Sequence, residues 1–217
     1  MSDDKKGQGF KLTLFALVGL FCQIILVLSV FSPEIFITNM NKELSLMDDV
    51  YGRKIATQYY DDAKSDSGAL VVESGVIDYM RFMFLPDWYI EKRPNNEHPI
   101  FKSMFTFVDN AIHNLFLNVE YTLLRINSFK AWVALFILTV IGSIATGTLI
   151  RKVKQHGFEY SSPHRLKAGK ILILISLFML YVFLVLPLTI HPFLFPLVIF
   201  IFNVGLVLFI ANIIKRV

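Results

Sequence analysis

The side chains that most often bind metals or transfer protons are scattered along this chain. Its five histidines are widely separated, and neither two histidines nor a histidine and the lone Cys22 are spaced to share one face of a helix. A glycine-rich phosphate loop and a G-x-S-x-G nucleophile turn are both missing from the sequence. The sequence therefore predicts no catalytic residue, no metal site and no cofactor, and we expect that the protein is not an enzyme.

One proline-rich stretch, residues 185–196, does combine a histidine with unusual backbone chemistry. Its characteristic residues are Pro187, Thr189, His191 and Pro192. Each proline lacks an amide donor and disfavours a helical conformation in the residue before it, so this stretch predicts a tight reversal of the chain. We expect His191 to cap the carbonyl groups that the preceding helix leaves free. The alternative is that its ring contacts an external domain, stacking on Trp88 or Tyr89, or a partner helix.

This reversal divides an apolar tract of 44 residues, 171–214, in a chain that is 55% hydrophobic. A bilayer crossing takes about 20 helical residues, so the tract is long enough for two crossings. We predict an all-α integral membrane protein with four transmembrane helices and a helical external domain between the first and second. The predicted spans are residues 12–31, 131–150, 171–188 and 193–214.

The distribution of lysine and arginine predicts the orientation of these spans. Residues 151–170 carry six Lys or Arg and one acid, whereas residues 32–130 carry ten Lys or Arg and fourteen acids. The positive-inside rule then places residues 1–11, 151–170 and 215–217 in the cytoplasm, with both termini inside. Residues 32–130 are expected outside, as the external domain.

Three helical segments are expected within residues 32–130. The first carries Leu44, Met47, Tyr51, Ile55 and Tyr59 at helical spacing, after a cap at Asn39 or Asn41. The second is the apolar segment 69–85. The third begins near Pro99 and is expected to bury one apolar stripe, with the possibility that it continues unbroken into the second span; the stripe is Phe101, Met104, Phe105, Val108, Ile112, Leu115, Val119, Leu123 and Ile126.

The second span ends in small residues and is followed by a basic run. Gly142 and Thr146, like Ser143 and Gly147, stand four residues apart and would let another helix approach closely, in a partner or in this chain. Gln23 and Asn203 are polar side chains expected to hydrogen-bond between helices. The basic segment predicts contact with anionic lipids of the inner leaflet or with a cytoplasmic partner. Its candidate contact residues are Arg151, Lys152, Lys154, Tyr160, Arg165 and Lys167.

From Gly142 onward, the order of these features resembles the integrating conjugative element membrane proteins, an uncharacterised family of bacterial inner-membrane proteins. The resemblance covers about the last 75 residues, and the chain departs from the family pattern at Thr146, where an acidic residue is usual, and in a shorter stretch around residues 161–163. The residues that carry it are Gly147, the basic residues 151–154, the sequence Gly-Phe-Glu-Tyr at 157–160, His164, Arg165, Lys167, Pro187, Thr189, His191 and Pro192.

The resemblance implies a multi-pass protein of the bacterial inner membrane that works beside the type IV coupling ATPase of a conjugation apparatus. The function expected from it is that of a non-enzymatic component of a conjugative or type IV secretion system, bound to the coupling ATPase or to channel subunits. Direct nucleic-acid binding is not expected. The alternative function is that of an independent small membrane protein, such as an exclusion factor or a permease-like protein.

Overall fold

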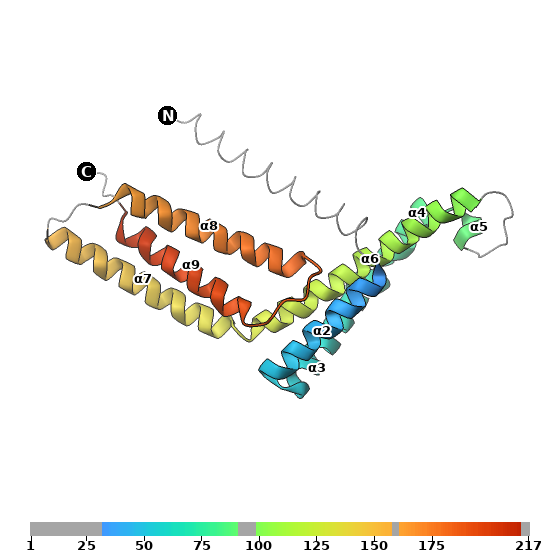
Figure 1. Cartoon of the computed structure of the whole chain (residues 1–217), viewed down its shortest axis with the longest axis horizontal. Coiled ribbons are helices and arrows are strands. Elements are labelled where there is room, and N and C mark those ends of the chain that lie inside the picture. Colours follow the sequence, from blue (N-terminus) through green and yellow to red (C-terminus); the bar gives the residue numbers. More distant parts are fainter. Residues whose placement is uncertain (1–31, 91–98, 158–160, 214–217) are drawn as a thin grey trace, which may run out of the picture. The chain divides into compact units, whose positions relative to one another are not determined.

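The computed structural model describes residues 32–90, 99–157 and 161–213, and all of the regular secondary structure in these residues is helical (Figure 1). The predicted all-α fold class is therefore confirmed. The predicted first span, residues 12–31, lies outside the described residues. The helices are α2 (Pro33–Tyr51), α3 (Arg53–Ser67), the π-helix η1 (Gly68–Glu73), α4 (Val76–Phe84), α5 (Asp87–Ile90), α6 (Pro99–Lys130), α7 (Val133–His156), α8 (Pro163–Val185) and α9 (Leu194–Ala211).

The chain divides into two compact units, and α2, α3 and α6 each contribute residues to both. One unit takes Met1–Lys42, Tyr60–Leu123 and Leu186–Thr189, and it contains α3 from Tyr60 onward, η1, α4 and α5. The other takes Glu43–Tyr59, Leu124–Val185 and Ile190–Val217, and it contains α7, α8 and α9.

Three helices, α7, α8 and α9, are each long and apolar enough to cross a membrane. In the bundle that they form, α9 packs against both α7 and α8 (Figure 1). Their apolar side chains are largely on the outside of the bundle, as expected where the surrounding solvent is lipid. These helices correspond to the predicted second, third and fourth spans.

Glycines set the distance between α8 and α9. A Cβ atom added to Gly169 would lie 2.6 Å from the backbone nitrogen of Phe209, and one added to Gly205 would lie 2.9 Å from Cβ of Leu172. The two backbones are therefore in direct contact, which in a membrane compensates for the missing hydrophobic driving force between helices.

The segment that we expected as a basic loop, residues 151–170, is mostly helical. Helix α7 continues to His156 and α8 begins at Pro163. The lysines and arginines of this segment therefore lie in the last turns of α7 or in the first turns of α8. A helix satisfies its own backbone hydrogen bonds and need not stop at the membrane surface, and proline is favoured as a first helical residue, as Pro163 is in α8. The helix dipole favours Lys154 in the last turn of α7, but it does not favour the cations near the start of α8.

The prediction for the first helix of residues 32–130 is wrong about where the helix starts and about its running unbroken to Tyr59. Helix α2 begins at Pro33, so Asn39 and Asn41 lie inside it and are not caps. The helical repeat also breaks at Gly52, whose φ of 83° belongs to the left-handed region that favours glycine. Gly75, with φ 73°, similarly separates η1 from α4 and divides the predicted segment 69–85 into two helices.

The apolar stripe predicted on α6 is not its buried face. Phe101 and Met104 are 51% and 49% exposed, and Ile126 is also exposed, although Ile112 is buried. The buried residues of α6 include five polar ones, Asn114, Glu120, Arg125, Asn127 and Ser128, and also Leu117, Tyr121 and Leu124. The helix also stops at Lys130, two residues before α7 begins at Val133, so α6 does not continue unbroken into the second span.

The close contact between α8 and α9 predicts a strong effect of one methyl group. Gly169→Ala should lower the free energy of unfolding by about 1–3 kcal/mol, because the added carbon would meet backbone atoms that cannot rotate away. Gly142→Ala on α7 is the matched control, since its added Cβ meets nothing within 4 Å. Thermal unfolding of the detergent-solubilised proteins would measure both, and equal stability of the two variants would contradict the packing.

Candidate functional site

The most heavily constrained polar cluster is a buried ion pair between α6 and α2. The guanidinium of Arg125 meets the carboxylate of Glu43 through two parallel bonds, with Nε donating to Oε1 at 2.8 Å and Nη2 donating to Oε2 at 2.7 Å. The two side chains are only 1% and 2% exposed. A bidentate arrangement of this kind is the strongest geometry available to an arginine and a carboxylate.

Both partners of this pair also hold the connection between α8 and α9. Arg125 donates from Nη1 to the carbonyl of Phe183 at 2.7 Å, and Glu43 accepts the amide of Ile190 at 3.0 Å. In a continuous helix the Phe183 carbonyl would accept the amide four residues later, but that residue is Pro187, which has no amide hydrogen. Arg125 thus supplies the donor that Pro187 removes.

The predicted turn residues lie in the non-helical segment between α8 and α9. Asn39 of α2 donates its side-chain amide to the Pro187 carbonyl at 2.9 Å, and the Thr189 hydroxyl donates to Oδ1 of Asn39 at 3.2 Å. Tyr121 donates from its hydroxyl to the carbonyl of Leu188 at 3.3 Å. The turn is therefore held by side chains from α2 and α6 as well as by its own prolines.

His191 does not have the role that we expected. Its Nδ1 accepts the backbone amide of Phe193 at 3.3 Å, and its ring stacks on the Phe193 ring with centroids 5.3 Å apart. The histidine thus caps an amide at the start of α9, whereas the freed carbonyl at the end of α8 is capped by Arg125. The aromatic residues that we considered as stacking partners, Trp88 and Tyr89, instead contact Phe105.

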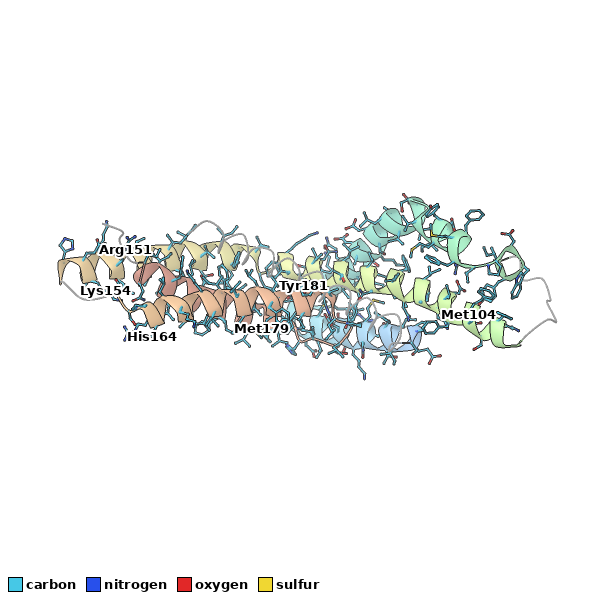
Figure 2. All side chains as sticks on the ribbon, turned by 90° about the horizontal axis from the view of Figure 1, so that it is seen from above. Met104, Arg151, Lys154, His164, Met179 and Tyr181 are labelled. Atoms are coloured by element: carbon cyan, nitrogen blue, oxygen red, sulfur yellow. The ribbon has the colours of Figure 1, made fainter. Side chains whose placement is uncertain are left out.

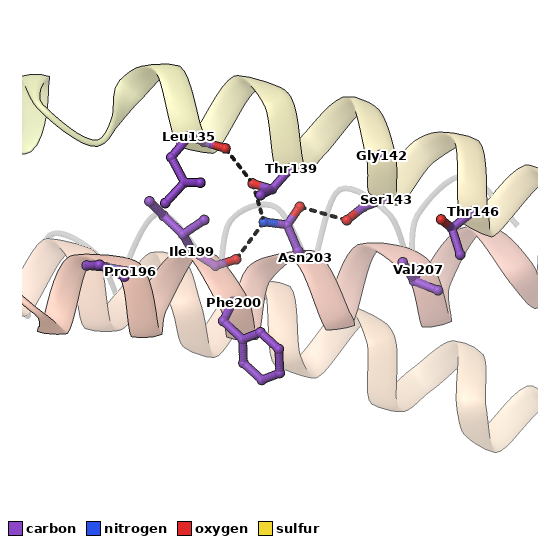
Figure 3. Close-up of a pocket in the computed structure, with 10 residues that line it drawn as sticks. All are labelled: Leu135, Thr139, Gly142, Ser143, Thr146, Pro196, Ile199, Phe200, Asn203 and Val207. Carbon is purple, nitrogen blue, oxygen red and sulfur yellow. Dashed lines mark hydrogen bonds between the residues drawn. The ribbon is translucent and has the colours of Figure 1, made fainter.

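The small-residue end of α7 divides into two faces. Ser143 donates its hydroxyl to Oδ1 of Asn203 on α9 at 2.8 Å, and a Cβ added to Gly147 would lie 2.8 Å from Cβ of Ile210. This pair packs within the chain. Gly142 and Thr146 are exposed and line a groove between α7 and α9 (Figure 3).

Asn203 makes the interhelical hydrogen bonds that its position predicted. Besides accepting from Ser143, it donates from Nδ2 to the Thr139 hydroxyl at 3.0 Å and to the Ile199 carbonyl at 2.7 Å (Figure 3). An amide in an apolar bundle is stable only when its donors and acceptor are satisfied in this way. Gln23, the other such residue, lies outside the described residues.

The basic residues gather at the end of the bundle where α7 stops and α8 starts, as the labelled Arg151, Lys154 and His164 show (Figure 2). Lys154 donates from Nζ to Oδ1 of the buried Asn212 at 2.8 Å, so it ties the end of α7 to the end of α9. Arg151 is half-buried, and the candidate contact residues Lys152, Arg165 and Lys167 are exposed. Tyr160 lies outside the described residues.

A second buried acid lies on α6. Glu120 is almost fully buried, and burial raises the pKa of its carboxyl above the ordinary value of 4.5, while the nearby charges of Lys64 and His113 lower the pKa by less. It belongs to the polar buried face of α6. Among the described residues, the structure contains no group of three or more His, Cys, Asp or Glu side chains that is arranged to hold a metal ion.

Sequence reasoning missed Glu43, Arg125 and Asn212. The positions of Glu43 and Arg125 among apolar residues could have indicated that they are buried. Glu43 stands on the same helical stripe as three apolar residues of α2 that are buried, Phe36, Met40 and Met47. Arg125 likewise stands four and eight residues after the buried Tyr121 and Leu117 of α6. A charged residue on an apolar stripe indicates a buried pair when a residue of opposite charge is placed similarly on another helix.

The chain shows similarity to one family of known proteins. Residues 54–214 match the sequence model of a family described as IncC plasmid conjugative DNA transfer protein DtrJ-like, which is more than half of the chain. This description agrees with the association with conjugation that the sequence resemblance implied, but it names a different family. Searches of curated proteins and of solved structures gave no match.

Loss of one partner of the buried ion pair should be strongly destabilising. Arg125→Met leaves the Glu43 carboxylate buried without its counter-charge and the Phe183 carbonyl without its donor, so we expect the free energy of unfolding to fall by about 3–5 kcal/mol. Arg81→Met is the matched control. Its ion pair with Asp109 is 43% and 30% exposed, and its loss should cost less than about 1 kcal/mol. Chemical denaturation in detergent would measure both, and similar losses would refute the assignment.

Because the pKa of Glu120 is raised, its burial should cost stability at neutral pH but not at acidic pH. Burial favours the protonated, neutral form of this carboxyl, so its contribution to the stability of the fold is complete below the unfolded-state pKa near 4.5. This contribution is lost as the pH rises through the higher folded-state pKa and the carboxyl becomes charged. Glu120→Gln should therefore stabilise the protein at pH 7 and change little at pH 4. The exposed Glu73→Gln is the control, with little effect at either pH. A Glu120→Gln variant that is less stable than the wild type at pH 7 would contradict this cost of burial.

Proposed function

Since this chain belongs to the DtrJ-like family of IncC plasmid conjugative DNA transfer proteins and so has a role in conjugative DNA transfer, we propose that it is a non-enzymatic membrane component of the transfer apparatus. In this proposal it is a multi-pass protein of the bacterial inner membrane with both termini in the cytoplasm. Its partners are the type IV coupling ATPase or secretion-channel subunits, together with anionic lipids of the inner leaflet, and it does not bind nucleic acid directly.

The single observation that carries this proposal is the family match, because it covers the membrane bundle as well as most of the helices before it. Three apolar helices that could span a membrane support the assignment to a membrane component. The DNA that is transferred has to cross the envelope, so a family member with such helices fits a place in the membrane part of the apparatus.

The use of the polar side chains supports a role without a chemical step. The buried charged groups Arg125 and Glu43 bond to the backbone at the end of α8 and in the turn before α9. The buried polar groups Asn203 and Asn212 join α9 to α7. These contacts hold helices in place. They are what a protein needs if it presents a fixed surface to partners in the membrane and at its edge.

The exposed cations supply the contact surface in this proposal. Arg165 and Lys167 lie on the first turns of α8 and are exposed, whereas the nearby Lys154 is engaged by Asn212. With this end of the bundle in the cytoplasm, these two side chains are available to an acidic surface of the coupling ATPase. Lys152 is exposed at the end of α7 and is suited to contact with anionic lipid headgroups.

Reversal of the exposed charges tests the proposal. The double variant Arg165→Glu, Lys167→Glu should accumulate normally in the membrane and yet recover less coupling ATPase in a pull-down after mild detergent extraction, with a matching loss of transfer frequency in mating assays. The neutral variant Arg165→Gln, Lys167→Gln should show a smaller loss. Lys54→Glu, Lys102→Glu is the matched control, because it reverses two exposed charges on α3 and α6.

Two outcomes would contradict the proposal. If neither the coupling ATPase nor a channel subunit is recovered with the wild-type chain, and the chain purifies as a stable homo-oligomer, it is an independent membrane protein such as an exclusion factor or a permease-like protein. If the partner is recovered equally well with the charge-reversed variant, Arg165 and Lys167 contact lipid and the partner binds elsewhere.

A further inference from the structure

An arginine near the end of α7 has a buried donor without an acceptor. The Nε atom of Arg151 is buried, and no group in the described part of the chain accepts a hydrogen bond from it. The side chain as a whole is only half-buried, so an acceptor from outside can reach the guanidinium. Folded proteins rarely leave a buried donor unsatisfied, and the cost is greatest when the donor belongs to a charged group. An acceptor supplied by another molecule would remove this cost.

A second cation is held in a fixed position beside Arg151. Lys154 follows it by three residues, on the same side of α7, and both lie at one end of the bundle (Figure 2). Lys154 donates from Nζ to Oδ1 of the buried Asn212 at 2.8 Å. Asn212 carries no charge, so this bond orients the ammonium group but does not neutralise it. The end of α7 therefore presents two neighbouring positive charges.

The described residues around these two cations contain no acid. Residues 147–157, 161–173 and 205–213 carry six Lys or Arg and no Asp or Glu. One of the six, Lys170 of α8, lies over the ring of Phe209 on α9, with its Nζ 5.8 Å from the ring centroid. Cations from α7 and from α8 thus contact the last residues of α9. A surface with charges of one sign attracts ions of the opposite sign, so this end of the bundle favours an anion.

The depth of Arg151 in a bilayer indicates what this anion is. At 1.5 Å per helical residue, Arg151 is about 27 Å along α7 from Val133, and Asn212 is about 27 Å from Leu194 along the axis of α9. Residues 133–150 carry no charge. The hydrocarbon core of a bilayer is about 30 Å thick, so a helix that spans it from Val133 brings Arg151 to the level of the lipid headgroups. The anionic groups at that level are lipid phosphates.

We propose that Arg151 binds the phosphate of an anionic phospholipid, with the charge of Lys154 beside it. A phosphate has several oxygens, so it can accept hydrogen bonds from adjacent nitrogens of one guanidinium, including Nε. A lipid with a net negative charge is favoured because the surrounding cations would repel the positive headgroup of a zwitterionic lipid. Ile144 is exposed on the same face of α7, two turns before Arg151, and can contact the acyl chains.

This site deepens the lipid contact in the proposed function, and it rests on the location of the chain in a membrane. It does not depend on the coupling ATPase. Charge reversal at Arg165 and Lys167 tests the contact with the ATPase and leaves Arg151 and Lys154 unchanged. Either proposal can therefore fail while the other holds.

Thermal unfolding of the delipidated full-length chain in detergent tests the site. Added dioleoyl phosphatidylglycerol should raise the Tm of the wild type to a plateau, and dioleoyl phosphatidylcholine should raise it much less. Arg151→Met should need a several-fold higher concentration of phosphatidylglycerol for the same shift. Without lipid this variant should be at least as stable as the wild type, because it lacks the unpaired donor. Lys152→Met is the matched control, since it removes an exposed charge from the next residue and should keep most of the shift.

The variant Arg151→Lys keeps the test decisive if Arg151→Met does not accumulate. It retains the positive charge but lacks the fork of donors, so it should also bind phosphatidylglycerol more weakly than the wild type.

Four results would overturn the proposal. A marked loss of stability of Arg151→Met without lipid would make Arg151 a structural residue. Equal weakening by Arg151→Met and Lys152→Met would mean diffuse attraction to the membrane surface. A Tm shift of the same size with inorganic phosphate alone would mean that the ligand is a soluble anion. The absence of any shift of the wild type with phosphatidylglycerol would leave Arg151 to an acidic side chain of a partner protein.

Discussion

The carbonyl of Phe183 is the group on which the arrangement of the turn and its supporting helices depends. Pro187 ends α8 by removing the amide that this carbonyl would accept, and the carbonyl lies where a lost hydrogen bond costs about 1–3 kcal/mol. Arg125 satisfies it, but a buried guanidinium is itself tolerated only beside a negative charge. Glu43 provides that charge, and its carboxylate also accepts a hydrogen bond from the amide of Ile190. The amide that Pro187 lacks is thus replaced by a connected group of hydrogen bonds among Arg125, Glu43, the Phe183 carbonyl and the Ile190 amide.

A turn fixed in this way determines how α9 enters the bundle. His191 caps the Phe193 amide, so α9 begins in a defined direction. Further along, Gly205 lets α9 touch the backbone of α8, and Asn203 and Asn212 bond to side chains of α7. The polar contacts give α9 a unique rotation and register, which apolar packing alone would not specify in a lipid environment.

The parts of this fold that the sequence predicted are those that solvent dictates. Lipid requires apolar helices of a minimum length, so the three helices that could span a membrane were placed from composition, and the prolines at 187 and 192 marked the turn because their backbone chemistry is local. The breaks at Gly52 and Gly75 were also local, but a glycine inside a helical pattern has several possible meanings, and only the fold showed that their φ values are positive. Periodicity then failed on α6, because it counted only apolar residues on a helix whose buried face mixes polar side chains with apolar ones.

The candidate site was harder to predict because its members are far apart in the chain. Arg125 and Glu43 are separated by 82 residues, and each alone resembles a surface charge on an amphipathic helix. The same holds for Lys154, which looks like one cation of a basic run until Asn212 is found 58 residues later. A single sequence contains the types of these residues but not their pairing, since the pairing follows from which helices pack together. The structure separates cations that hold helices from those that remain exposed, such as Arg165 and Lys167, and only exposed cations can contact another molecule without breaking an internal bond.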